Sequence, residues 1–133
     1  MLVFMKVSEL ALRTKVSAHR LRRYEELGLI RAERNSSGYR DFSENTVREV
    51  IFIAMSRELG FSLKDLSETV PSYRANTLTF DEMIDRMHIR VEQVTIQITA
   101  QQALRKKLIA HIEWLKDRKR EFKLRPKTQR KKK

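Results

Sequence analysis

The chain of 133 residues contains no cysteine, three glycines and two prolines. Without cysteine it has no disulfides, no thiolate metal ligands and no thiol redox switch. No apolar stretch approaches the ~20 residues that span a bilayer, and no cationic segment followed by an apolar core of secretory length opens the chain. We therefore expect a cytoplasmic protein with no membrane partner.

Patterns that carry catalysis or hold metal ions are also missing. The sequence offers no Ser/His/Asp arrangement and no paired carboxylates that would favour an enzyme. His88 and His111 are 23 residues apart, and neither has a second ligand at metal-site spacing. Asp81, Glu82 and Asp85 lie at a predicted helix start, where the helix dipole favours negative charge. We predict a protein that is not an enzyme and uses no metal or other cofactor.

The charge is strongly positive but unevenly distributed. The net charge of +12 and the pI of about 10.4 indicate a polyanionic partner, such as nucleic acid or an acidic membrane surface. Residues 1–62 carry a net charge of +3, residues 63–115 carry none, and residues 116–133 carry +9. The end of the chain thus holds most of the excess. The case for DNA binding must therefore rest on residues in the first half.

Two short helices are predicted near the start of the chain. Ser8 is expected to cap a helix that runs to about Arg13, and Ser17 to cap a second helix that ends at Gly28. Their three-residue connection has helix-turn-helix spacing. In the second helix the helical period places Leu21, Tyr24 and Leu27 on the core side. The opposite side, which a recognition helix would present to a DNA groove, carries Ala18, His19, Arg22, Arg23 and Glu26.

A hairpin and two further helices should complete this head. Residues 30–34 and 39–42 are predicted strands around the turn at 35–38, and they form the wing. Ser43 is expected to cap a third helix closed by Gly60. The apolar stripe of that helix is predicted to be Val47, Val50, Ile51 and Ala54. A capping box over 62–65 should open a fourth helix, which Pro71 should end.

The second half of the chain is predicted to be a linker, a long helix and a tail. Residues 71–78 are the linker, 79–124 the helix, and 125–133 a basic disordered tail. A capping box over 79–82 should open the helix. Nine of twelve positions in a 3,4 alternation along the helix are apolar. They are Ile84, Met87, Val91, Val94, Ile98, Leu108, Ile112, Leu115 and Phe122, and Gln101, Arg105 and Lys119 fill the other three. A helix of ~65 Å cannot bury such a stripe on a small head, so we predict a homodimeric coiled coil with polar groups that fix its register.

The head contains short motifs in a fixed order: Met5-Lys6-Val7-Ser8-Glu9-Leu10-Ala11, Val16-Ser17, Leu21-Arg22-Arg23-Tyr24-Glu25, Leu27-Gly28-Leu29-Ile30, Gly38-Tyr39-Arg40 and Arg57-Glu58-Leu59-Gly60-Phe61-Ser62-Leu63. Together they closely resemble the DNA-binding domain of the MerR family of bacterial transcription regulators, over roughly residues 5–70. The resemblance implies a mainly α fold, with a winged helix-turn-helix head (helix-turn-helix about 8–27, wing 30–42) and an antiparallel coiled-coil dimer. It also implies a pseudo-palindromic promoter operator that the dimer bends and untwists, with RNA polymerase on the same promoter.

The resemblance also implies the DNA-contacting residues. Its recognition helix falls on 17–27, its wing arginine on Arg40, and a second wing near Lys64. The implied DNA-binding residues are Ser17, Ala18, His19, Arg22, Arg23, Tyr24, Tyr39, Arg40 and Lys64. Two positions depart from the family pattern. Lys15 stands where glycine is usual in the turn, and Arg23 stands where an aromatic is expected.

An effector site would lie at the junction of head and stalk or in the dimer interface. Four residues could form it, although core packing explains them too: Tyr73, Phe80, Met83 and Met87. No effector can be named from the sequence. The basic tail either solubilises the chain or adds sequence-independent phosphate contacts. Two further functions remain open: an effector-independent architectural DNA-binding protein, and a coiled-coil adaptor whose basic tail binds nucleic acid.

Overall fold

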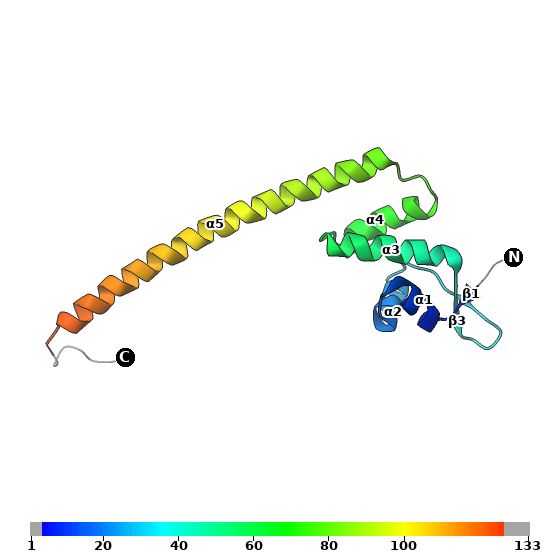
Figure 1. Cartoon of the computed structure of the whole chain (residues 1–133), viewed down its shortest axis with the longest axis horizontal. Helices are drawn as coiled ribbons and strands as arrows, with labels where there is room; N and C mark the ends of the chain where they lie inside the picture. The colour runs from blue at the N-terminus through cyan, green and yellow to red at the C-terminus, as the bar shows by residue number, and fades with distance from the viewer. Residues whose placement is uncertain (1–3, 127–133) are drawn as a thin grey trace. The chain divides into compact units, whose positions relative to one another are not determined.

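The computed structural model describes residues 4–126. Its elements, in chain order, are β1 (Phe4–Met5), α1 (Val7–Thr14), α2 (Ala18–Glu26), β2 (Glu33–Arg34), β3 (Arg40–Ser43), α3 (Glu44–Glu58), α4 (Leu63–Arg74) and α5 (Phe80–Leu124) (Figure 1). The chain divides into two compact units, and the boundary falls between Met87 and His88, inside α5. No helix within residues 4–126 is long and apolar enough to cross a membrane.

The helix-turn-helix forms as predicted except at its first cap. The residue before α1 is Lys6, in an extended conformation, and Ser8 lies inside the first turn. The prediction of a Ser8 cap was wrong because β1 leads directly into α1 and starts the helix earlier. Ser17 does cap α2, since its hydroxyl accepts a hydrogen bond from the Arg20 amide at 3.2 Å. Gly28 follows the helix with φ of 75°, as a glycine at a helix end should.

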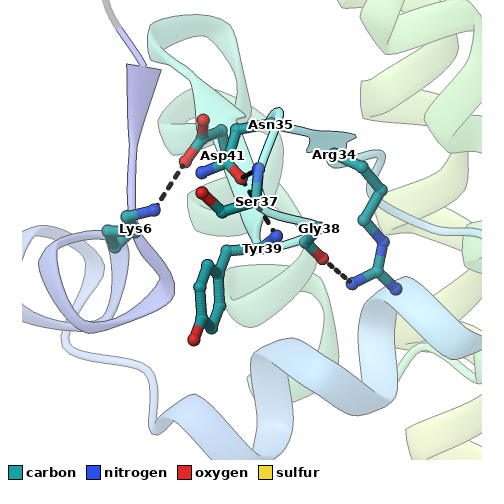
Figure 2. Close-up of polar contacts among 7 residues, drawn as sticks. All are labelled: Lys6, Arg34, Asn35, Ser37, Gly38, Tyr39 and Asp41. Atoms are coloured by element: carbon teal, nitrogen blue, oxygen red, sulfur yellow. Dashed lines mark hydrogen bonds and ion pairs between the residues drawn. The ribbon is translucent and has the colours of Figure 1, made fainter.

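The wing is an antiparallel hairpin of β2 and β3, to which β1 adds a third strand in the order β1-β3-β2. The turn is built by Asn35, whose side-chain oxygen accepts from the amides of Ser37 and Tyr39 at 2.9 and 3.1 Å (Figure 2). Gly38 has φ of 82°. The predicted first strand was too long, because Ile30 is buried in the core. The strand β1 was not foreseen.

The core of the head gathers residues from every element except β2 and α5, and from the connecting segments: Met5, Leu10, Val16, Leu21, Tyr24, Leu29, Ile30, Phe42, Val50, Ile53, Leu66 and Val70. In α3 the predicted stripe was wrong at Ile51, which is exposed, while Ile53 is buried. The reason is that α3 packs against both α1 and α4, so two neighbours set its buried face. Ser43 does precede α3, but its hydroxyl lies 3.3 Å from that of Thr46 and caps no backbone amide.

The capping box of α4 is present. The Ser62 hydroxyl accepts from the Asp65 amide at 3.0 Å, and the Asp65 carboxylate accepts from the Ser62 amide at 2.9 Å. The prediction that Pro71 ends this helix was wrong, because α4 continues to Arg74. Its last turn is held by the ring of Tyr73, which stacks on Phe52 of α3 with centroids 4.2 Å apart. The connection to α5 therefore begins after residue 74.

The helix α5 spans 45 residues, in agreement with the predicted long helix. The Glu82 amide donates to the Thr79 hydroxyl at 3.1 Å and so begins it with the expected cap. In this single chain every apolar position of the predicted seam is between 37% and 62% exposed. Helix propensity can extend α5, but it leaves these apolar positions exposed. The expected disordered tail falls largely on residues 127–133, which lie outside the described residues.

Candidate nucleic-acid interface

The exposed face of α2 is the first component of the site. His19, Arg22, Arg23 and Glu26 are exposed on it, and Ala18 is half-buried, as the helical period predicts. The Arg23 guanidinium lies 3.8 Å from the carboxylate of Glu26, which is one helical turn away. Arg22 makes no hydrogen bond or ion pair with any residue between 4 and 126. Its guanidinium is therefore available to a partner outside the chain.

Tyr24 lies on the inner side of the same helix. Only 4% of the residue is exposed, so its ring belongs to the core as predicted. The hydroxyl accepts a hydrogen bond from Arg20 at 2.7 Å, and the Arg20 guanidinium lies 5.7 Å from the ring centroid. Arg20 thus holds the Tyr24 hydroxyl in place. Leu27, expected in the core, is instead partly exposed.

The wing presents Tyr39, whose side chain is exposed. The Lys6 ammonium lies 5.2 Å from the centre of the Tyr39 ring and 3.4 Å from the Asp41 carboxylate. Arg34 donates to the Gly38 carbonyl at 3.1 Å, at the turn of the hairpin (Figure 2). Lys6 and Arg34 thus join Tyr39 at the wing, although sequence reasoning did not select them. Arg34 could have been selected from the sequence, because it is a cation directly before the Asn35 turn.

Arg40, which the family resemblance assigns to the DNA contacts, is ion-paired with Glu25 on α2, and both side chains are half-buried. It stands directly opposite Arg34 in the hairpin, where two like charges repel each other. Glu25 neutralises Arg40 and removes this conflict. The pair also ties β3 to α2, so Arg40 positions the wing against the recognition helix.

Lys64 is exposed in the first turn of α4, directly after the Ser62 cap. No contact among the described residues joins it to α2 or to the wing. The structure therefore brings the α2 and wing residues together through Glu25 and Arg40, and leaves Lys64 as a separate cation on the head.

Only two of the four candidate effector residues share a cavity. Met83 and Met87 line an apolar pocket of about 40 Å³ together with Phe52, Phe61, Leu66 and Leu78. Tyr73 instead stacks on Phe52 and lines a separate polar hollow. Phe80 is 80% exposed. A pocket of this size is too small for a drug-sized ligand, which needs roughly 300 Å³ or more.

The described residues 4–126 contain no group of three or more histidine, aspartate or glutamate side chains placed to hold a metal ion.

The chain matches known families over most of its length. Residues 5–72 match the family described as "MerR HTH family regulatory protein", and residues 47–111 match "MerR, DNA binding". The transcriptional regulator HmrR of Rhizobium leguminosarum bv. viciae is 29% identical over 104 residues, or 78% of this chain and 81% of that protein. The mercuric resistance operon regulatory protein of Bacillus cereus is 32% identical over 94 residues, which cover 70% of this chain and 71% of that one.

Among solved structures, the chain is similar to HiNmlR, described as a MerR family regulator lacking the sensor domain, bound to promoter DNA. The TM-score is 0.57 at 22% identity, over 75% of this chain and 76% of that one, and this likeness concerns the fold. The winged helix-turn-helix head and the long C-terminal helix are thus the family's architecture. The chain belongs to the MerR family of helix-turn-helix transcriptional regulators, which are DNA-binding proteins and not enzymes.

Proposed function

We propose that this regulator binds a pseudo-palindromic promoter operator as a homodimer and distorts the DNA to control transcription by RNA polymerase. The observation that carries the proposal is the free guanidinium of Arg22 on the exposed face of α2, next to a wing tied to that helix by Glu25 and Arg40. A recognition helix and its wing must hold one relative position to engage a groove and the flanking backbone together. The regulator would act in the cytoplasm.

Each part of the interface has a suitable chemistry. Arg22 can donate two hydrogen bonds to the O6 and N7 atoms of a guanine, which is the most common specific contact in a major groove. Lys6, Arg34 and the Tyr39 hydroxyl can contact phosphates, which orient the protein without reading sequence. We therefore assign sequence selectivity to α2 and orientation to the wing.

The homodimer is supported by the uncovered seam of α5. Its nine apolar positions are exposed in the single chain, and burying them needs a second copy of the same helix. The helix begins with Asp81, Glu82 and Asp85 and ends among lysines and arginines from 116 onward. An antiparallel pairing brings these opposite charges together, whereas a parallel pairing opposes like charges.

A small-molecule effector remains a secondary proposal, because the Met83 and Met87 pocket is closed to all but the smallest ligands. An architectural protein without an effector uses the same interface. Unwinding of promoter DNA that depends on an added metabolite would separate the two.

The test is a salt titration of binding to a duplex from the promoter nearest the gene, against a scrambled duplex. We expect Arg22→Ala to weaken specific binding by about 1–3 kcal/mol and to leave scrambled-duplex binding almost unchanged. Lys107→Ala, which removes one exposed cation from α5, is the charge-matched control. A chain ending at residue 125 should lose affinity for both duplexes and show a shallower salt slope. If Arg22→Ala weakened both duplexes equally, the assignment of base reading to α2 would be wrong.

A further inference from the structure

The seam of α5 is interrupted near its middle by two polar residues. Gln101 and Arg105 are exposed, and they line one shallow hollow of the helix surface together with Val94 and Ile98. They therefore share the face that the proposed homodimer would bury. A polar group in such an interface costs free energy unless it finds a hydrogen-bond partner. In the homodimer, residues of the second copy must supply the partners of Gln101 and Arg105.

In an antiparallel pairing, the seam positions alone determine which residues of the two copies face each other. The alignment that overlaps the whole seam sets Ile84 of one copy opposite Phe122 of the other. Every further layer then follows from the alternation: Met87 faces Lys119, Val91 faces Leu115, Val94 faces Ile112, Ile98 faces Leu108, and Gln101 faces Arg105. The two interior polar residues thus meet each other, and they do so twice because the dimer is symmetric.

Any other register separates them. A slip of one heptad in one direction sets Arg105 opposite Val94 and Gln101 opposite Ile98. A slip in the other direction sets Arg105 opposite Leu108 and Gln101 opposite Ile112. Parallel helices in register would oppose the two Arg105 side chains. Each alternative sets Gln101 and Arg105 against apolar side chains, or brings two like charges face to face.

We propose that Gln101 of one protomer and Arg105 of its partner form two symmetric hydrogen bonds that select a single antiparallel register. The Arg105 guanidinium donates, and the amide oxygen of Gln101 accepts. This inference rests on the proposed homodimer. Its consequence concerns DNA, because a one-heptad slip moves one helix along the other by about 10 Å. DNA-binding heads that follow their helices would then be displaced by about three base pairs.

The natural absence of cysteine makes the register directly measurable by disulfide cross-linking of full-length protein. Val91→Cys is combined in turn with Leu115→Cys, Leu108→Cys and Phe122→Cys. These three double variants report the proposed register and the two slipped registers without altering Gln101 or Arg105. Val91→Cys alone reports parallel pairing. We expect the pair at 91 and 115 to cross-link about tenfold more than any of the others.

A second set of variants tests whether the polar pair causes this selectivity. Gln101→Leu with Arg105→Leu should keep the dimer but raise the slipped cross-links toward the level of the main one. The exchange Gln101→Arg with Arg105→Gln restores the pairing across the interface and should keep a single register. Gln101→Arg alone sets two guanidinium groups opposite each other, so this variant should lose the single register.

The outcomes separate the inference from the function. A dimer in which a slipped pair or Val91→Cys alone cross-links best would overturn the register assignment. The register assignment would also be overturned if the variant with Gln101→Leu and Arg105→Leu kept the same preference for the 91–115 cross-link. In both cases a homodimer that still discriminates the operator would leave the proposed function standing. A monomer in sedimentation experiments would instead remove the proposed homodimer and this inference with it.

Discussion

Glu25 on α2 is ion-paired with Arg40 on β3, and this contact joins the recognition helix to the wing of the head. The two residues are 15 positions apart and belong to different elements. Both side chains are partly shielded from water, so salt screens their attraction less than on the open surface. The pair therefore helps to hold β3 against α2.

A double-mutant cycle with Glu25→Ala and Arg40→Ala should give a coupling free energy of about 0.5–3 kcal/mol in urea unfolding. Both single variants should also weaken operator binding, because either one releases the wing. The exposed pair of Arg23 and Glu26 is the control, and its coupling should stay below about 0.5 kcal/mol. Tighter operator binding by Glu25→Ala would instead mean that Glu25 restrains Arg40 from contacting DNA.

Arg74 near the end of α4 should be among the most sensitive positions of the head. It is ion-paired with Glu49 of α3, whose side chain is only 9% exposed, and it donates to the Leu29 carbonyl at 2.9 Å. Arg74→Ala would leave a buried carboxylate without its partner, at a cost of about 3–5 kcal/mol. Combining it with Glu49→Gln should recover part of the stability. Urea unfolding at fixed protein concentration measures both, and an Arg74→Ala loss below ~1 kcal/mol would contradict the assignment.

Lys15 should be replaceable by glycine with a gain in stability. Its φ of 59° lies in the left-handed region, which costs a residue with a side chain about 1–2 kcal/mol. Glycine removes that cost but adds about 0.5–1 kcal/mol of chain entropy, so we expect a net gain of up to ~1 kcal/mol for Lys15→Gly. Lys15→Ala removes the same charge without relieving the backbone. Equal gains from both variants would show that charge, not conformation, is responsible.

The capping box of α4 should make the head sensitive to acid. The backbone amide of Ser62 holds the pKa of Asp65 below its ordinary value of 3.8, and the Ser62 side chain adds to this. The charged carboxylate therefore stabilises the fold fully above pH 3.8, and this contribution is lost as the pH falls through the lower folded pKa. The stability difference between the natural chain and Asp65→Asn should shrink in that window. Ser62→Ala should cost about 1 kcal/mol at neutral pH, and a pH-independent Asp65→Asn difference would contradict the carboxylate's role.

Sequence reasoning succeeded where neighbouring residues determine the structure. The caps at Ser17, Ser62 and Thr79 depend on amides three residues away, and all three form. The caps expected at Ser8 and Ser43 do not form. The exposed and buried sides of α2 follow its period, apart from Leu27. It failed where distant segments decide. Strand β1 exists because Met5 pairs with Phe42, and Ile53 replaces Ile51 in the core because α3 has two packing partners.

The candidate site divides in the same way. The exposure of Arg22 followed from the sequence, because a helical period shows which side chains leave the core. The ion pair of Arg40 did not, because its partner Glu25 lies on another element. Lys6 was missed because it approaches Tyr39 only after β1 has paired with β3.

The sequence by itself determined the order of the helices, the outward face of α2 and the apolar seam of α5, because periodicity and capping act over a few residues. The tertiary structure decided how the wing is held, which face of α3 is buried and where α4 ends. Those outcomes depend on contacts between segments far apart in the chain, such as Arg40 with Glu25 and Tyr73 with Phe52. No local pattern encodes which distant partner a side chain will meet.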